Sequence, residues 1–94
     1  MVTIIYNSIN GQERRIALSV KEKFAERARL LRESRGLTTR MLADELDISH
    51  GAISLYEGAK RTAGAEVIRK YTEYFNVSPD YLLGITDHSI KDRK

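Results

Sequence analysis

The chain has 94 residues, with 16 lysines and arginines against 13 aspartates and glutamates, a net charge of +3 and a pI near 9.3. A chain of this length has room for one small domain, and a deep substrate cleft is hard to enclose in it, so we do not expect an enzyme. Since the sequence contains no cysteine, it allows neither disulfides nor a thiolate metal site, and we expect no metal or other cofactor.

The first eighteen residues differ in character from the rest. The runs VTIIY and RRIAL are rich in β-branched and aromatic residues and flank Asn10-Gly11, the pair most typical of a two-residue hairpin turn. A turn centred there pairs Ile5 with Ile16. Because a lone two-stranded ribbon is marginal in water, this hairpin either packs on the body as a lid or forms a dimerisation arm, and both interpretations remain open.

A helix of about four turns is predicted to follow the hairpin. Ser19 and Glu22 have the spacing of a capping box, and Gly36 is placed to end the helix. Apolar residues recur in it every three or four positions, which predicts a face toward the core. These residues are Val20, Phe24, Ala28 and Leu31.

Positive charge is concentrated in residues 21–40, which carry seven cations and three glutamates, a local balance of 7 − 3 = +4. Such a run can track phosphates, or it can be a solvated helix face with charge pairs along it. The sequence leaves both interpretations open. The cations are Lys21, Lys23, Arg27, Arg29, Arg32, Arg35 and Arg40.

Residues 38–58, TTRMLADELDISHGAISLYEG, predict two short helices joined by a tight polar turn. Thr38 is a suitable N-cap for the first helix, and Asp47 can adopt the left-handed conformation that ends it. Ser49 can cap the second helix, which Gly58 closes. The positions predicted to be buried are Leu42, Ala43, Leu46, Ala52, Ile53 and Tyr56. Two helices joined in this way form a helix-turn-helix unit, which places its second helix in the major groove of DNA.

Two more helices are predicted in the C-terminal third. One runs from about Ala65 to Phe75, and a short one starts at Ser78-Pro79, where a capping serine is followed by proline at the first helical position. We expect the chain to divide into an N-terminal hairpin, a helical domain and a frayed tail. Their expected bounds are 1–18, 19–84 and 85–94.

Four segments resemble the Cro/repressor-type helix-turn-helix family, often called Xre-like: RLLRESRGL, LADEL-DIS, ISLYEGAKR and YFNVSPDYLLG. The resemblance covers about residues 27–84. It implies a mainly α, five-helix, lambda-repressor-like helix-turn-helix domain, here preceded by the N-terminal β-hairpin, which lies outside the match.

The resemblance also assigns roles to single residues. Arg32 and Glu57 stand where the family pairs an arginine of its first helix with a glutamate that ends the recognition helix, a structural ion pair. Base edges are read in the family mainly at the positions of His50, Gly51 and Leu55. The imidazole can hydrogen-bond to guanine or adenine and the leucine can contact a thymine methyl, whereas the glycine offers only close approach.

Contacts with the DNA backbone are expected around this helix. Amides at the starts of the two motif helices can point at phosphate oxygens, and two cations follow the second helix where the family places backbone-binding residues. The expected phosphate contacts are Thr38, Thr39, Ser49, Ser54, Lys60 and Arg61. Thr39 replaces the family's usual glutamine, so we expect it to brace a recognition side chain less well.

The sequence therefore predicts a sequence-specific transcriptional regulator of bacterial or phage type, a repressor, that binds operator DNA as a homodimer with residues 50–57 in the major groove. The alternative is a protein-interaction module, antitoxin-like or antirepressor-like, with weak or no base reading, which the apolar Gly51 and Leu55 favour. We expect no small-molecule substrate. No apolar run approaches the ~20 residues of a membrane span, and no signal-peptide core is present, so we expect no membrane partner and a cytoplasmic, nucleoid-associated location.

Overall fold

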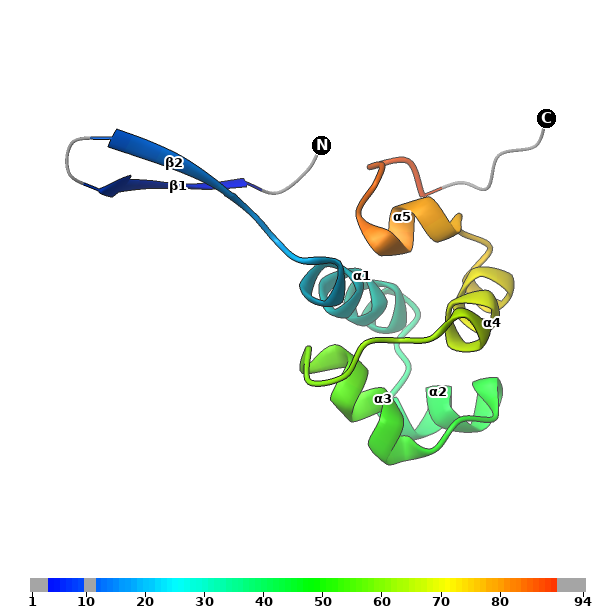
Figure 1. Cartoon of the computed structure of the whole chain (residues 1–94). Helices are drawn as coiled ribbons and strands as arrows, with labels where there is room; N and C mark the ends of the chain where they lie inside the picture. The colour runs from blue at the N-terminus through cyan, green and yellow to red at the C-terminus, as the bar shows by residue number, and fades with distance from the viewer. Residues whose placement is uncertain (1–3, 10–11, 90–94) are drawn as a thin grey trace.

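The computed structural model describes residues 4–9 and 12–89, with side chains described from residue 18 onward. In these ranges the elements are β1 (Ile4–Ile9), β2 (Gln12–Ala17), α1 (Val20–Ser34), α2 (Thr39–Leu46), α3 (His50–Glu57), α4 (Ala65–Phe75) and α5 (Pro79–Leu83). The helices gather into one body, with α1 packed against α3 and α5 (Figure 1). No helix within the described ranges is long and apolar enough to cross a bilayer.

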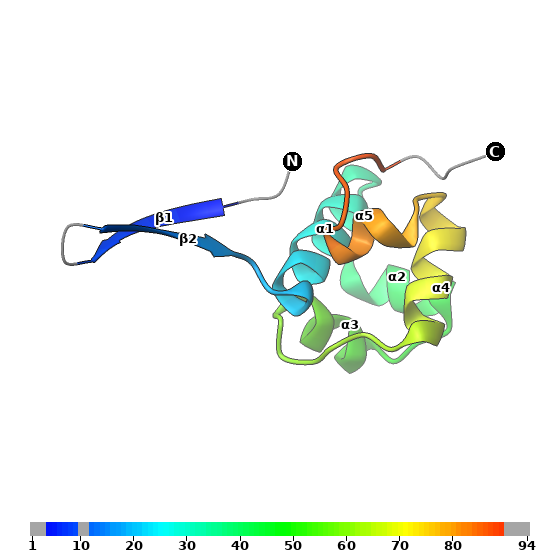
Figure 2. The ribbon, with the colours of Figure 1, turned by 45° about the horizontal axis from the view of Figure 1, so that its top comes forward.

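The strands β1 and β2 pair antiparallel as a two-stranded sheet, in a register that sets Ile5 opposite Ile16. The ribbon extends away from the helices and leads into the start of α1 (Figures 1 and 2). The predicted turn at Asn10-Gly11 lies outside the described residues.

Helix α1 begins at a complete capping box. The Ser19 hydroxyl accepts from the Glu22 amide at 3.1 Å, and the Glu22 carboxylate accepts from the Ser19 amide at 3.0 Å. The prediction that Val20 faces the core was wrong, since its side chain is 53% exposed. It occupies the first position of the helix, beyond the edge of the core, which begins one turn later at Phe24.

The five helices all end in the same way. At the C-terminal end of each helix, one residue adopts the left-handed conformation. The N–H of the next residue donates a hydrogen bond to the helix carbonyl five positions earlier, which is the Schellman arrangement. The left-handed residues are Gly36, Asp47, Ala59, Asn76 and Gly84. The residues that donate back are Leu37, Ile48, Lys60, Val77 and Ile85, at 2.8–3.2 Å. The donating residue is therefore apolar at four helix ends and is a lysine only after α3.

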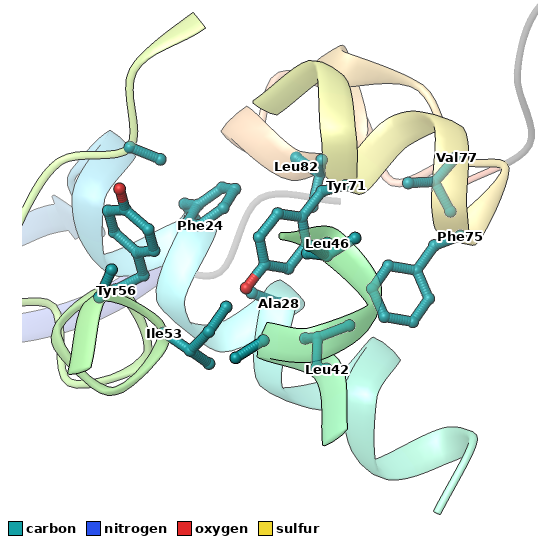
Figure 3. Packing of buried hydrophobic residues seen from close by; sticks show 13 residues of the cluster. Phe24, Ala28, Leu42, Leu46, Ile53, Tyr56, Tyr71, Phe75, Val77 and Leu82 are labelled. Atoms are coloured by element: carbon teal, nitrogen blue, oxygen red, sulfur yellow. The ribbon is translucent and has the colours of Figure 1, made fainter. Parts of the chain in front are cut away.

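The core lies between all five described helices and is organised around Tyr71, which is completely buried (Figure 3). Phe24 packs edge-on against its ring, with centroids 5.1 Å apart, and also against Tyr56 of α3. Ile53, from the middle of α3, is completely buried too. These contacts fix one face of α3 against the body and leave its other face outside.

Residues 85–89, which we expected to belong to a frayed tail, are instead held against the helices. Arg27 of α1 is buried and donates to the carbonyl oxygens of Tyr81 and Thr86 at 2.9 and 2.6 Å. It also donates to the carboxylate of Asp87 at 2.9 Å. The Ser78 amide donates to the Ser89 carbonyl at 3.0 Å. The rest of the expected tail lies outside the described residues.

Candidate nucleic-acid interface

The turn between α2 and α3 sets the direction of α3, so that one face of this helix points away from the body. Asp47 adopts φ 55° and ψ 50°, and its carbonyl oxygen accepts from Lys70 Nζ at 3.2 Å, which ties the turn to α4. Ile48, packed against the core, donates its amide to the Ala43 carbonyl at 3.0 Å. The chain then starts α3 at the N-cap Ser49, so α2 and α3 are two separate helices at one end of the body (Figure 1).

The two faces of α3 have different environments. Its buried positions are Ala52, Ile53, Tyr56 and Glu57. The outer positions are His50, Gly51 and Ser54, which are exposed, and Leu55, which is half-buried. A Cβ built on Gly51 would meet no atom within 4 Å, so nothing within the described body covers this part of the helix. The candidate base-reading residues therefore share one accessible surface.

The side chains of Thr39 and His50 meet at the start of this surface. Thr39 Oγ1 lies 2.9 Å from His50 Nε2, a hydrogen bond whose direction depends on the imidazole tautomer. The short hydroxyl of Thr39 thus reaches the side chain of His50 directly. The bond leaves Nδ1 as the second ring nitrogen of His50 for another partner.

The candidate phosphate contacts lie at the starts of α2 and α3, on the outer face of α3, and directly after α3. Thr38 and Ser49 cap α2 and α3, and their hydroxyls accept from the amides of Met41 and Ala52 at 3.0 and 3.1 Å. These hydroxyl oxygens therefore already accept hydrogen bonds from the first turns of the helices. A bound phosphate would accept from the remaining free amides and from the hydroxyl protons. Ser54 lies on the outer face of α3, and Lys60 and Arg61 follow the helix; all three are exposed.

The guanidinium of Arg32 and the carboxylate of Glu57 form a two-point ion pair between α1 and the last residue of α3. Nε and Nη2 donate to the two carboxylate oxygens at 2.7 and 2.9 Å, and the side chains are only 14% and 6% exposed. Nη1 also donates to the Leu37 carbonyl at 2.7 Å. The bond to Glu57 raises the pKa of Arg32. The pair fixes the end of α3 to α1, and it holds Arg32 inside the fold.

Arg29 also contacts the end of α3, a contact that we did not predict. Its Nη2 donates to the Glu57 carbonyl at 3.3 Å, and its Nε lies 4.0 Å from the Glu57 carboxylate, while its side chain is 54% exposed. The available signal was the spacing of Arg29 and Arg32, which puts two arginines on the same face of α1 one turn apart.

Several cations of residues 21–40 have structural roles that neither open interpretation describes. Lys23 and Arg27 are buried in the body, where Lys23 bonds to Glu26 at 3.2 Å. Arg35 stacks its guanidinium 4.9 Å from the ring centre of Phe75 and donates to carbonyls at the end of α4. Lys23, Arg27 and Arg32 are therefore buried or half-buried, whereas the other four cations of the run are exposed, so the run combines contacts inside the fold with a charged surface.

This geometry is that of helix-turn-helix proteins, and comparisons with known proteins agree. A family model described as "Helix-turn-helix domain" matches residues 25–87. The HTH-type transcriptional regulator ImmR of Bacillus subtilis (strain 168) is 33% identical over 67 residues, 71% of this chain and 53% of ImmR. The chain belongs to the Xre-like helix-turn-helix family.

A solved structure extends the comparison. The crystal structure of the restriction-modification controller protein C.AhdI from Aeromonas hydrophila matches with a TM-score of 0.61 and 26% identity, over 66% of this chain and 94% of C.AhdI. The chain therefore accounts for nearly all of that structure, whereas its match spans about half the length of ImmR.

Proposed function

We propose that this protein is a transcriptional regulator of bacterial or phage type, a repressor, that binds double-stranded DNA with α3 in the major groove. The observation that supports this most is the accessible outer face of α3, which is anchored by Ile53 and by the Arg32–Glu57 pair and is followed by Lys60 and Arg61. A rigid helix with one open face and adjacent cations suits a grooved polyanion. Such a regulator acts on DNA in the cytoplasm.

Sequence reading falls to His50, Gly51 and Leu55 in this proposal. His50 is the one of them with a side-chain hydrogen-bonding group, and Thr39 fixes its ring, so its Nδ1 is directed to a base edge as donor or acceptor according to tautomer. Leu55 suits a thymine methyl group. Gly51, with open space around its Cα, permits the groove floor to approach the helix backbone.

Backbone positioning falls to residues on that surface and at its two ends. The amides and hydroxyls at the helix starts and the cations after α3 contact phosphates, which set the orientation but carry no sequence information. The assigned residues are Thr38, Thr39, Ser49, Ser54, Lys60 and Arg61.

We also propose that two copies bind one operator. The few base contacts of one α3 provide only a few kcal/mol of discrimination, whereas specific sites generally need about 4–10 kcal/mol. Two copies about 34 Å apart, one turn of DNA, double the number of contacts. The ribbon of β1 and β2 extends from the body and has unpaired strand edges, so residues 1–18 act as the dimerisation arm beside a DNA-binding domain of residues 19–84.

The alternative is a protein-interaction module that keeps the fold without reading bases. It is favoured by the apolar character of Gly51 and Leu55 together with Met41, which is 48% exposed near the start of α2. An apolar surface of this kind suits a protein groove better than a polar base edge.

A salt titration of binding to random duplex DNA separates the two. We expect a steep fall in affinity with salt, and a log–log slope smaller by about 2 when Lys60→Ala and Arg61→Ala are combined. Arg69→Ala is the control, because Arg69 lies on α4 and is paired with Glu66 and Glu73. Absence of salt-dependent binding at low ionic strength would reject DNA binding in favour of the interaction module.

A further inference from the structure

Two exposed arginines outside the set just described lie at the two ends of α3. Arg40 belongs to the first turn of α2, directly after Thr39, and the Thr39–His50 bond of 2.9 Å places that turn beside the start of α3. Arg29 belongs to α1 and touches Glu57, the last residue of α3. Each arginine comes from a different helix, so their placement depends on the fold.

Arg40 is in an unfavourable position for the isolated protein. It is exposed, and within the described residues its side chain has no hydrogen bond or ion pair. A cation in the first turn of a helix also opposes the positive end of the helix dipole. An anion placed at this end of α3 would therefore remove a repulsion and satisfy the guanidinium.

Arg29 is exposed and weakly bound, whereas Arg32, one helical turn further along α1, is half-buried and fully paired. The guanidinium of Arg32 donates to both oxygens of Glu57 and to the Leu37 carbonyl, and its side chain is half-buried. Arg29 makes only long contacts, 3.3 and 4.0 Å, to the same glutamate and keeps more than half of its side chain exposed. Arg29 can therefore reach an external anion without breaking the Arg32–Glu57 pair.

We infer that Arg29 and Arg40 bind DNA phosphates at the two ends of α3, one on each strand that borders the major groove. The inference rests on the proposed function. Helix α3 has eight residues, which is about 12 Å at 1.5 Å per residue, and the major groove is about 12 Å wide. Cations at both ends of a helix of this length match phosphates on both sides of the groove.

The test is a salt series of affinities for random duplex DNA, measured with Arg29→Gln, Arg40→Gln and both together. We expect each single variant to bind about three- to tenfold more weakly at low salt and to reduce the log–log salt slope by about 1, and the double variant to reduce it by about 2. Arg69→Gln removes the same charge from α4 and should leave the slope unchanged. Thermal melting of each variant verifies that it is folded.

The conservative variant Arg29→Lys separates a phosphate contact from a structural role, because it keeps the charge but loses the planar fork that faces Glu57. A slope that Arg29→Lys retains and Arg29→Gln loses supports the inference. Unchanged slopes for Arg29→Gln and Arg40→Gln, in a protein whose slope still falls with Lys60→Ala and Arg61→Ala, would overturn the inference and leave the proposed function standing. If the unaltered chain shows no salt-dependent binding, the proposed function fails and the inference fails with it.

Discussion

Ala59 holds a backbone conformation that suits glycine. Its φ of 57° lies in the left-handed region, which costs an L-residue with a Cβ about 1–2 kcal/mol. Gly58 closes α3 as its C-cap, as predicted, but its φ is −87°, and the left-handed residue follows one position later at Ala59. We predict that Ala59→Gly raises the free energy of unfolding by about 1 kcal/mol, measured by urea denaturation, because glycine adopts this conformation without the steric penalty.

The control for this prediction is Ala65→Gly, at the exposed first position of α4, where the backbone is helical. Glycine has no advantage there, so the free energy of unfolding should stay the same or fall. A loss of stability in Ala59→Gly would show that the left-handed conformation is not present at the end of α3.

Tyr71 carries the only buried side-chain polar atom, within the described residues, that has no hydrogen-bond partner. Burial, together with the carboxylate of Glu57, raises the pKa of its phenol. The folded protein therefore keeps the hydroxyl protonated to a higher pH than the unfolded chain does. Ionisation of this phenol therefore leaves the stability of the fold unchanged below the unfolded pKa of about 10, and stability is lost as the pH rises above it toward the folded pKa.

We predict that Tyr71→Phe raises the free energy of unfolding at neutral pH by about 1 kcal/mol, because it removes a hydroxyl that is buried without a partner. The variant should also lose less stability than the unaltered chain between pH 9 and pH 11. Denaturation curves across this pH range measure both effects. Tyr56→Phe, in another buried tyrosine, should give no gain. A destabilised Tyr71→Phe variant with an unchanged alkaline profile would refute this account of Tyr71.

At the scale of elements, the helix boundaries follow from local signals in the sequence. The hydroxyls of Ser19, Thr38, Ser49 and Ser78 each accept from an amide three residues later, as the capping patterns predict. Asp47 ends α2 in the left-handed conformation, also as predicted. These features depend on residues close in sequence, so the identity of the residues is enough to place them.

Contacts between distant residues could not be placed in the same way. The sequence shows Arg27 only as one cation in a basic run, although it is separated by 54 to 60 positions from the groups it binds. We could predict the Arg32–Glu57 pair only from the family resemblance, and no feature of that resemblance indicated the contact between Arg29 and Glu57. Which arginine is buried depends on the packing of α1 against α3 and α5, and that packing has no local signal.

We predict that Arg27→Met releases residues 85–89 and lowers the free energy of unfolding by about 2–4 kcal/mol, because it leaves the Tyr81 and Thr86 carbonyl oxygens without their buried donor. Hydrogen exchange measures the release, since the Ser78 amide donates to the Ser89 carbonyl and should exchange faster in the variant.

Asp87→Asn is the matched comparison for Arg27→Met. Asp87 is 36% exposed, so its contribution to the ion pair is screened by solvent and the cost should be below about 1 kcal/mol. If Arg27→Met and Asp87→Asn were equally mild, and Ser78 exchange did not change, the contacts of Arg27 would not hold residues 85–89 in place.

At the scale of the whole molecule, the dimerisation arm is the part of the proposal that lies outside the helix-turn-helix body. Because the body contains the described hydrophobic core, removal of residues 1–18 should leave it folded. We predict that the full chain sediments as a dimer and the truncated chain as a monomer. Circular dichroism verifies the helices. A truncated chain that still sediments as a dimer would place the interface on the helices instead of the arm.

The central claim is that the outer face of α3 meets DNA, and a backbone-amide NMR titration with random-sequence duplex DNA tests it most directly. The account predicts that the largest chemical-shift changes cluster at residues 38–40, 49–55 and 60–61, and that they disappear at high salt. Amides at the centre of α4 around Arg69 should shift little. Shifts confined to other helices, or no salt-sensitive shifts at all, would contradict the account.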